Sequence, residues 1–384
     1  MLSPLRRSLP LFGRRWKPLD FSNQSFVRIP EYHKIEEEAL PDYVASIYYP
    51  RRIGEVIKER YQVVGKFGFG STSTHRYIML KIFVQASLFG RHDDNELRLY
   101  QHIEQCPEGH RRREAIRVLL DTFDIEGPTD THHTLTFLHR NPMERLPSAV
   151  LAMVLWRVLL KLDYLHTQCE VARTDIKTDN IMLGIDNDSV FSEFEEKELE
   201  HPVPRKEVGP DGRIIYVSRD LKLPKNIARP VLCDFGSAMI AKEYQTEFVQ
   251  PNIYQAPEVI IGVPWAYSVD IWNIWHIYEG GSLFTGHDHE FQRYRSRAHL
   301  AEIINLLGSP PPTLLVKGEL REKFFTVEGE FGDAHLLTDR VPLEKRETTL
   351  AGQEEREAFL RLMEKMLQWE PHERSSAKEL AEGE

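Results

Sequence analysis

The sequence predicts an α+β fold with two lobes, a small strand-rich lobe followed by a larger helical lobe. Three observations predict it. Residues 61–84 have strand-like composition, residues 148–166 have the pattern of an amphipathic helix, and the chain from residue 267 onward is mostly helical in pattern. With 384 residues, of which 41% are hydrophobic, the chain has enough apolar material for one large two-lobed domain or two smaller ones.

The small lobe is predicted at about residues 56–140 and the large lobe at about residues 141–384, after a polar extension over residues 1–55. In the small lobe, residues 94–103 have a helical pattern. The large lobe opens on the helix over residues 148–166, which carries apolar side chains at helical spacing: Leu151, Val154, Leu155, Val158, Leu159 and Leu162. Residues 350–368 form a late helix in the same way.

A charged insertion at about residues 186–229 interrupts the large lobe. It carries a run of acidic side chains at Glu193, Glu195, Glu196, Glu198 and Glu200, and then several prolines and glycines. An acidic run is more often a solvated helix face than a docking site, so we expect a solvated helix followed by a loop.

Bulk properties exclude several functions. A formal charge of −10 argues against a nucleic-acid binder that relies on bulk charge and would suit a basic protein substrate. The longest apolar stretch, residues 149–160, is short and carries Arg157, so we expect a buried helix and no membrane span. Three scattered cysteines provide neither a disulfide framework nor zinc-ligand spacing, which indicates a reducing compartment.

The first 19 residues contain five basic residues and no acidic one. This composition fits a mitochondrial presequence, although three prolines interrupt any helix there. A basic disordered tail is the interpretation that we prefer.

Two motifs carry the chemistry. The stretch from Val171 contains Asp175, then Lys177 two residues on and Asn180 five residues on, and an apolar strand further along ends in Asp234-Phe-Gly. Phosphoryl transfer needs a carboxylate to accept the substrate hydroxyl proton, a cation over the moving phosphoryl group, and an amide and a second carboxylate to hold Mg²⁺. Asp175, Lys177, Asn180 and Asp234 fit these four roles in order. Either motif alone also fits a turn or a polar surface loop, but in this order they resemble protein kinases.

Upstream, the segment from Gly68 through Gly70 to Ser73 resembles a glycine-rich loop that covers nucleotide phosphates. A dinucleotide-binding fingerprint would require a helix after the glycines, whereas another strand follows here. Lys81 on that strand is the candidate phosphate-binding lysine, and Glu96 on the next helical segment is its candidate ion-pair partner. Each alone would also fit a solvated side chain.

Downstream, Ala256-Pro-Glu258 closes a candidate activation segment, and Asp270 opens an apolar helix with Ile271 and Trp272. Arg374 stands where protein kinases place the partner of the Glu258 carboxylate. The alternative for Arg374 is an exposed arginine near the end of the chain. If the Glu258–Arg374 pair is buried, loss of either partner would cost roughly 3–5 kcal/mol.

From about residue 40 onward the chain resembles the SR-protein kinases, especially their fungal branch. The resemblance rests on residues 53–66, 174–177, 249–262 and 283–286, with Thr174 before Asp175 as a specific marker. It implies a serine/threonine kinase that uses ATP and Mg²⁺ and acts on Arg/Ser-rich splicing factors in cytoplasm and nucleus. Apart from this resemblance, we expect a monomer that makes no direct contact with nucleic acid or membrane. Thr174 cannot pair with a phosphate, so the activation segment should need no phosphorylation.

The chain departs from that pattern in its nucleotide-binding half. The interval from Ser73 to Lys81 is too short for the hairpin that folds over ATP, and Met79 replaces a small residue beside the adenine, so we expect weak ATP binding. Much of the hinge before the helix over residues 148–166 and about four residues after Asn273 are missing. Arg173 stands where the family has a histidine under the Phe of Asp-Phe-Gly, and a buried arginine needs a polar partner. Three interpretations remain: an active kinase, a catalytically impaired pseudokinase that serves as a binding module, and an incomplete gene model of an active kinase.

Overall fold

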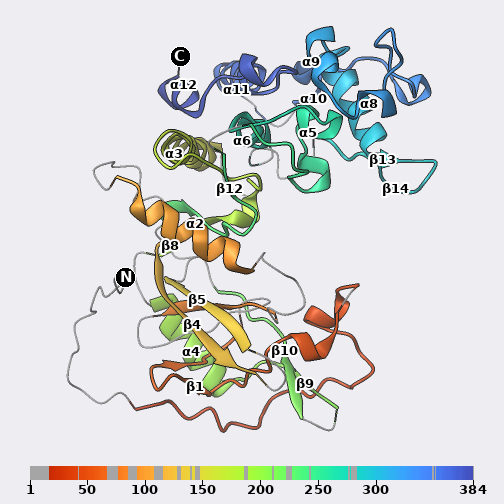
Figure 1. Ribbon diagram of the computed structural model, residues 1–384. Helices are drawn as coiled ribbons and strands as arrows, with labels where there is room; N and C mark the ends of the chain where they lie inside the picture. Colours follow the sequence, from red (N-terminus) through yellow and green to blue (C-terminus); the bar gives the residue numbers. More distant parts are fainter. Residues whose placement is uncertain are drawn as a thin grey trace. The chain divides into compact units, whose positions relative to one another are not determined.

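The computed structural model describes residues 17–41, 43–66, 77–84, 93–107, 116–127, 131–138, 141–142, 148–185, 189–209, 212–221, 227–241, 244–275, 277, 283–347, 350 and 352–383. Its fold is α+β, as the sequence predicts. The chain divides into two compact units, which are described separately (Figure 1). The first unit combines Met1–Val84, Asp124–Thr136 and Asp188–Lys222, and the second unit contains the rest of the chain.

The first unit is built of short strands, short 3-10 helices and one longer helix. Its elements are η1 (Glu36–Ala39), η2 (Ala45–Ile47), β1 (Val56–Ile57), β2 (Tyr61–Gln62), β3 (Ile78–Ile82), most of β5 (Thr131–Leu138), the end of β4 (Leu119–Glu126), α4 (Ser189–Glu200), β9 (Arg205–Val208) and β10 (Arg213–Tyr216). Strands β1 and β2 pair antiparallel, as do β9 and β10, and a three-stranded sheet has the order β3-β5-β4.

The insertion differs from its prediction as a solvated helix and loop. The predicted helix forms as α4, but Phe191 and Phe194 are each only 4% exposed, and the ring of Phe191 stacks on Tyr77 with centroids 4.6 Å apart. Further along the insertion, Arg205–Val208 (β9) and Arg213–Tyr216 (β10) pair as an antiparallel hairpin, where the sequence predicted a loop. Spacings of three and four residues place Phe191, Phe194 and Glu198 on one face of the helix, so that face is buried although the helix is rich in acids.

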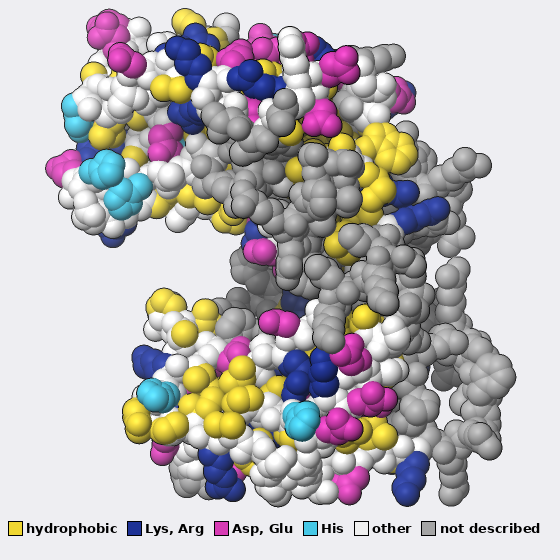
Figure 2. All heavy atoms as spheres, turned by 180° about the vertical axis from the view of Figure 1, so that it is seen from behind, with side chains coloured by type: hydrophobic (Ala, Val, Ile, Leu, Met, Phe, Trp, Pro, Cys, Tyr) yellow, Lys and Arg dark blue, Asp and Glu magenta, His cyan; other side chains and the backbone are white. Residues whose placement is uncertain are grey.

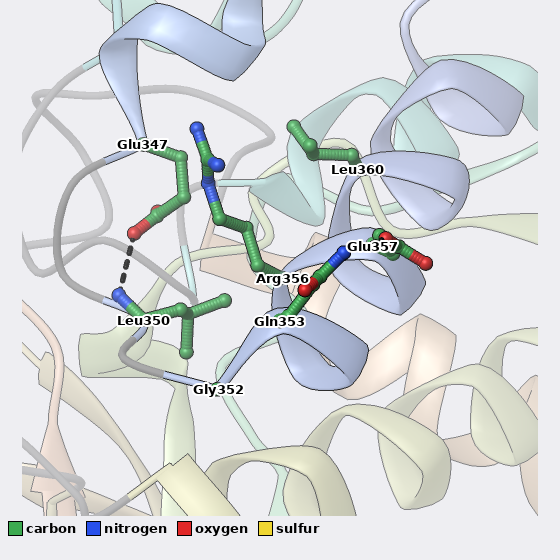
Figure 3. Close-up of a pocket in the computed structure, with 7 residues that line it drawn as sticks. All are labelled: Glu347, Leu350, Gly352, Gln353, Arg356, Glu357 and Leu360. Atoms are coloured by element: carbon green, nitrogen blue, oxygen red, sulfur yellow. Dashed lines mark hydrogen bonds between the residues drawn. The ribbon is translucent and has the colours of Figure 1, made fainter.

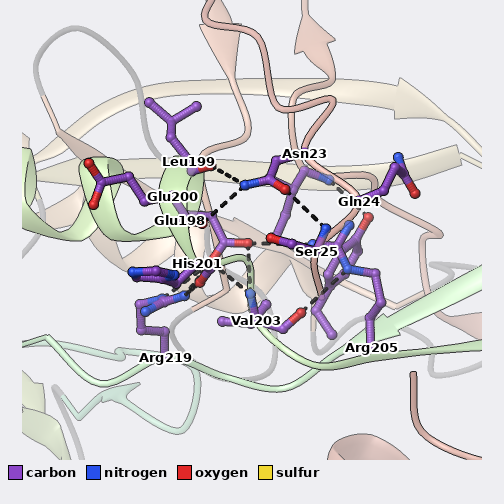
Figure 4. A network of polar contacts seen from close by, with 12 residues as sticks. Asn23, Gln24, Ser25, Glu198, Leu199, Glu200, His201, Val203, Arg205 and Arg219 are labelled. Atoms are coloured by element: carbon purple, nitrogen blue, oxygen red, sulfur yellow. Dashed lines mark hydrogen bonds and ion pairs between the residues drawn. The ribbon is translucent and has the colours of Figure 1, made fainter. Parts of the chain in front are cut away.

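A polar network closes the end of α4 (Figure 4). Glu198 is 1% exposed and lies 2.9 Å from Arg219 Nη2 and 3.6 Å from Arg205 Nη2. Burial raises the pKa of Glu198, while the hydrogen bonds from Arg219 and from the Val203 N–H oppose that rise. Asn23 Nδ2 donates to the carbonyl oxygens of Leu199 at 2.7 Å and Glu200 at 3.0 Å, so a side chain from the N-terminal extension caps the last turn of the helix.

The described part of the N-terminal extension is therefore integrated into the first unit. The backbone N–H of Leu19 donates to Gln62 Oε1, and Gln62 Nε2 donates back to the Leu19 carbonyl, each at 2.8 Å. Lys206 Nζ on β9 lies 2.8 Å from Glu38 Oε1. Residues 1–16, which hold most of the basic side chains of the predicted tail, lie outside the described residues.

The second unit is mainly helical. Its helices are α2 (Asp93–Gln105), α3 (Ser148–Thr167), η5 (Thr178–Asn180), η6 (Asn252–Tyr254), α5 (Pro257–Ile261), α6 (Ser268–Asn273), α8 (Ser296–Leu307), α9 (Pro312–Lys317), η7 (Arg321–Lys323), η8 (Ala334–Leu336), α10 (Leu343–Arg346), α11 (Gln353–Met366), η9 (Pro371–Glu373) and α12 (Ala377–Glu382). Its strands are β6 (Asn141–Pro142), β7 (Val171–Ala172), β8 (Ile181–Ile185), β11 (Ile227–Leu232), β12 (Met239–Ile240), β13 (His287–Asp288) and β14 (Arg293–Tyr294).

The core of the second unit surrounds α3, whose Val154, Val158 and Leu162 are fully buried. Helix α3 packs against α12, β7 and β11, and Figure 1 shows α3 and α12 close together. Strand β8 lies between β11 and β6, and β7 pairs antiparallel with β12. These two small sheets hold the segments that follow β7 and β11, where the sequence places its chemistry.

Acidic, basic and hydrophobic side chains are mixed on the visible surface of each unit (Figure 2). Within the described residues, no helix is both long and apolar enough to cross a membrane.

Candidate functional site

Asp270 on α6 fixes the loop that follows β7. Its carboxylate accepts hydrogen bonds from the backbone N–H groups of Arg173 and Thr174, each at 2.7 Å, and lies 2.8 Å from His166 Nε2. Thr174 has a φ of 61°, a left-handed conformation that is uncommon for a residue other than glycine. The buried carboxylate therefore stabilises a strained turn directly before Asp175.

The two oxygens of Asp175 have different surroundings. Oδ2 lies 3.0 Å from Lys177 Nζ and accepts a hydrogen bond from Asn180 Nδ2 at 2.8 Å. Oδ1 has no hydrogen-bond partner among the described residues. Three of the four predicted residues thus come together on one turn, and the second carboxylate oxygen is buried with its hydrogen-bonding capacity unused.

Asn180 is held in a single orientation. Its Nδ2 donates to both the side chain of Asp175 and the Asp175 carbonyl, the latter at 2.9 Å, so its amide oxygen is directed elsewhere. The Asn180 carbonyl accepts a hydrogen bond from the Cys233 N–H at 3.0 Å. This bond joins Asn180 to the residue that precedes Asp234.

The Asp234-Phe-Gly segment follows β11, which pairs antiparallel with β8. Asp234 has a φ of 58°, again in the left-handed region. Helix α2 contacts this segment: the Phe235 N–H donates to Glu96 Oε1 at 3.3 Å, and Asn95 Nδ2 donates to the Gly236 carbonyl at 2.8 Å. An amide oxygen on Asn180 and a carboxylate on Asp234 are hard oxygen donors of the kind that Mg²⁺ prefers, so these residues fit the predicted ion.

The predicted nucleotide-binding residues are only partly described. Gly68, Gly70 and Ser73 lie outside the described residues. Lys81 is on β3 in the first unit, with its Nζ 5.2 Å from the centre of the Phe83 ring, and Met79 on the same strand is half-buried. Glu96 is 1% exposed and belongs to the second unit, so its ion pair with Lys81 stays a prediction.

Glu258 on α5 and Arg374 after η9 form a bidentate ion pair. Arg374 also donates to the backbone carbonyls of Gln368 and Ser268, each at 3.0 Å, and its guanidinium lies 5.0 Å from the Trp272 ring centre. The pair therefore connects α5, α6 and the segment before α12.

Two residues that contact the site were not among the predicted ones. Asn95 precedes Glu96 in the helical pattern, and its amide could have been suspected because it comes directly before a candidate site residue. Tyr254 on η6 lies near the catalytic turn, and burial, together with the charges of Asp179 and Asp175, raises the pKa of its phenol. No sequence signal marks Tyr254, because its position depends on the path of the activation segment.

A pocket of about 420 Å³ lies elsewhere in the second unit, beside the first turns of α11 (Figure 3). It is lined by Glu347, Leu350, Gly352, Gln353, Arg356, Glu357 and Leu360. None of the sequence-predicted site residues lines it.

Comparison with known proteins matches this chain to protein kinases. Residues 213–384 match the family model described as protein kinase domain. A serine/threonine protein kinase of Aspergillus fumigatus is 35% identical over 378 residues, covering 90% of this chain and 89% of the relative. The serine/threonine-protein kinase SRPK of Physarum polycephalum is 28% identical over 402 residues, covering 90% of each. Protein kinase dsk1 of Schizosaccharomyces pombe is 24% identical over 415 residues, covering 79% of this chain and 76% of the relative.

Proposed function

The chain belongs to the serine/threonine protein kinases, and on that premise we propose that it transfers the γ-phosphoryl group of ATP to serines in Arg/Ser-rich proteins. Such substrates imply a role in regulating mRNA splicing, in cytoplasm and nucleus. The names of the SRPK-type relatives support this substrate class, and the acidic formal charge of −10 suits a basic substrate.

The observation that carries the proposal is the asymmetry of the Asp175 carboxylate. Lys177 and Asn180 hold Oδ2, while Oδ1 is buried without a hydrogen-bond partner among the described residues, so Oδ1 is the oxygen that would accept the proton of the substrate serine once the bound substrate reaches it. The serine oxygen then forms a bond to the γ-phosphorus while the bond from that phosphorus to the β-γ bridging oxygen breaks, giving phosphoserine and ADP.

The other roles follow from position. Lys177 places a positive charge beside Asp175, where it would stabilise the transferred phosphoryl group. Asn180 and Asp234 would hold Mg²⁺, which when bound neutralises charge on the phosphates. Lys81 and Glu96 would form the ion pair that positions the phosphates, with Gly68, Gly70 and Ser73 over them.

Transfer to three matched peptides tests the proposal. The first alternates Arg and Ser, the second has Lys in place of every Arg, and the third has Ala in place of every Ser. With Mg²⁺ and labelled ATP, we expect label in the first peptide, none in the third and at least about tenfold less in the second, because a lysine does not reproduce the bidentate hydrogen bonding of an arginine.

Asp175→Asn is the control for chemistry, because it removes the base with little change in volume. We expect its transfer rate to fall by at least about a hundredfold, in line with the usual contribution of a general base. Equal labelling of the Lys peptide would overturn the Arg/Ser substrate class alone. Absence of transfer by the wild type, with peptide binding retained in both proteins, would instead favour a non-catalytic binding module.

A further inference from the structure

Arg173 is a buried arginine with an incomplete set of partners. It is 0% exposed, and its Nη2 donates to the Cys233 carbonyl at 2.8 Å. Its Nε and Nη1 have no hydrogen-bond partner among the described residues. Burying a guanidinium is costly unless its contacts are strong, so the contacts that it does make are expected to matter.

Those contacts lie on both sides of Asp234. The guanidinium carbon of Arg173 lies 5.4 Å from the centre of the Phe235 ring, within the range of a cation–π interaction. Phe235 is fully buried and contacts the Tyr100 ring at 5.2 Å in an edge-on arrangement. One arginine thus binds the carbonyl of the residue before Asp234 and packs on the ring of the residue after it.

Asp234 needs such support because its backbone is strained. A φ of 58° places it in the left-handed region, which costs an aspartate more than it costs a glycine. The backbone of Arg173 is itself held in place, because its N–H donates a hydrogen bond to Asp270 Oδ2 at 2.7 Å. A chain of contacts therefore runs from α6 through Arg173 to the peptide bonds that flank Asp234.

We propose that Arg173 is the positioning residue for Asp234: its charge-assisted hydrogen bond to the Cys233 carbonyl and its packing on Phe235 hold the carboxylate in the strained conformation that binds Mg²⁺. The Mg²⁺ part rests on the proposed function. A histidine or an apolar side chain at this position would still pack under Phe235. A neutral histidine could also donate an uncharged hydrogen bond, whereas a cationic donor makes a charge-assisted bond to the preceding carbonyl that is roughly twice as strong.

The first test does not depend on activity. Cys233, Cys106 and Cys169 are all buried and none is part of a disulfide, so alkylation by N-ethylmaleimide, followed at each cysteine by mass spectrometry, reports on local opening. We expect Arg173→Met to speed alkylation of Cys233 by about tenfold, the effect of losing one charge-assisted hydrogen bond, with Cys106 and Cys169 unchanged. Arg173→Lys keeps a cationic donor and should stay within about threefold of the wild type.

Two results would overturn the proposal. One is an unchanged rate at Cys233 in Arg173→Met, and the other is an equal rise at all three cysteines, which would indicate a general structural role. If Arg173→Met does not fold, Arg173→Gln takes its place, since Gln keeps a donor and loses the charge. A Cys233 rate in Arg173→Gln equal to that of the wild type would then overturn the proposal.

The second test uses phosphoryl transfer. Arg173→Met should raise the Mg²⁺ concentration for half-maximal rate by about tenfold while kcat at saturating Mg²⁺ stays within about threefold, because a positioning role affects formation of the site more than the chemistry. A fall in kcat with no shift in the Mg²⁺ requirement would overturn the Mg²⁺ part. If the wild type transfers nothing, the proposed function fails, and the alkylation rates still decide whether Arg173 positions Asp234.

Discussion

Arg374 and Glu258 form two parallel hydrogen bonds between the guanidinium and the carboxylate. Arg374 Nη1 and Nη2 lie 2.6 Å from Glu258 Oε1 and Oε2 respectively, and both side chains are 0% exposed. An ion pair of this kind is specific in geometry, and neither charge has access to water if the other is removed.

We expect Arg374→Ala to lower the free energy of unfolding by roughly 3–5 kcal/mol, because it leaves the Glu258 carboxylate buried and unpaired. Urea denaturation measures this directly. The matched control is Arg361→Ala, which removes an arginine whose side chain is 65% exposed and should change stability by less than about 0.5 kcal/mol. A loss below about 1 kcal/mol in Arg374→Ala would contradict the prediction.

His299 on α8 gives the stability of the protein a specific pH dependence. Burial lowers the pKa of His299 to about 3, well below its value of 6.5 in an unfolded chain. The unfolded state therefore takes up a proton first as pH falls. The stability due to the neutral histidine is complete above about pH 6.5 and is lost progressively as the pH falls towards 3.

His299→Gln should flatten this dependence. Between pH 6.5 and 4.5 we expect the wild type to lose up to about 1.4 kcal/mol more stability per pH unit than the variant. Urea denaturation at several pH values compares the two proteins, so that contributions from other groups largely cancel. Parallel stability curves would show that the prediction is wrong.

The packing of the insertion can be tested at Gly65 and Phe194. A Cβ at residue 65 would lie 2.6 Å from two ring carbons of Phe194, which is closer than such atoms approach. We expect Gly65→Ala to cost about 1–3 kcal/mol by overpacking and Phe194→Ala about 3–5 kcal/mol by leaving a cavity. In the double variant the new methyl group partly fills that cavity. The stability loss of the double variant should therefore be smaller than the sum of the losses of the two single variants. Additive losses in urea denaturation would count against this packing.

The activation segment should function without phosphorylation. Thr174 donates through Oγ1 to the Ser237 carbonyl at 2.7 Å, and Gln250 Nε2 donates to the Val269 carbonyl at 2.9 Å, so uncharged groups hold both ends of the segment. The rate of transfer to an Arg/Ser peptide should change by less than about twofold after phosphatase treatment, because these contacts involve no phosphate group that the phosphatase could remove. Activity that appears only after an upstream kinase acts would contradict this.

The parts of the site that depend on local spacing could be predicted from the sequence. Asp175, Lys177 and Asn180 lie within six residues, so one turn suffices to bring their side chains together, as the structure shows. The Glu258–Arg374 pair is distant in sequence, and it was anticipated only through the resemblance to a known family.

Contacts that depend on tertiary packing could not be predicted. From the sequence, a buried Arg173 could be expected to need a polar partner. That partner is the backbone carbonyl of Cys233, 60 residues away, and a backbone group cannot be recognised from residue type. The buried face of α4 was missed because five glutamates dominate its composition, while the burial depends on Phe191 and Phe194. The total charge of a helix does not indicate which of its faces packs.

The reciprocal hydrogen bonds between Leu19 and Gln62 set a limit on proteolytic maturation. If the basic stretch at the N-terminus is removed on import into an organelle, cleavage must occur before Leu19 for both bonds to survive. A protease that cut beyond Asn23 would also remove the side chain that caps the last turn of α4. The start of the mature chain, determined by N-terminal sequencing, would therefore distinguish a leader that is removed without damage to the fold from a tail that stays attached.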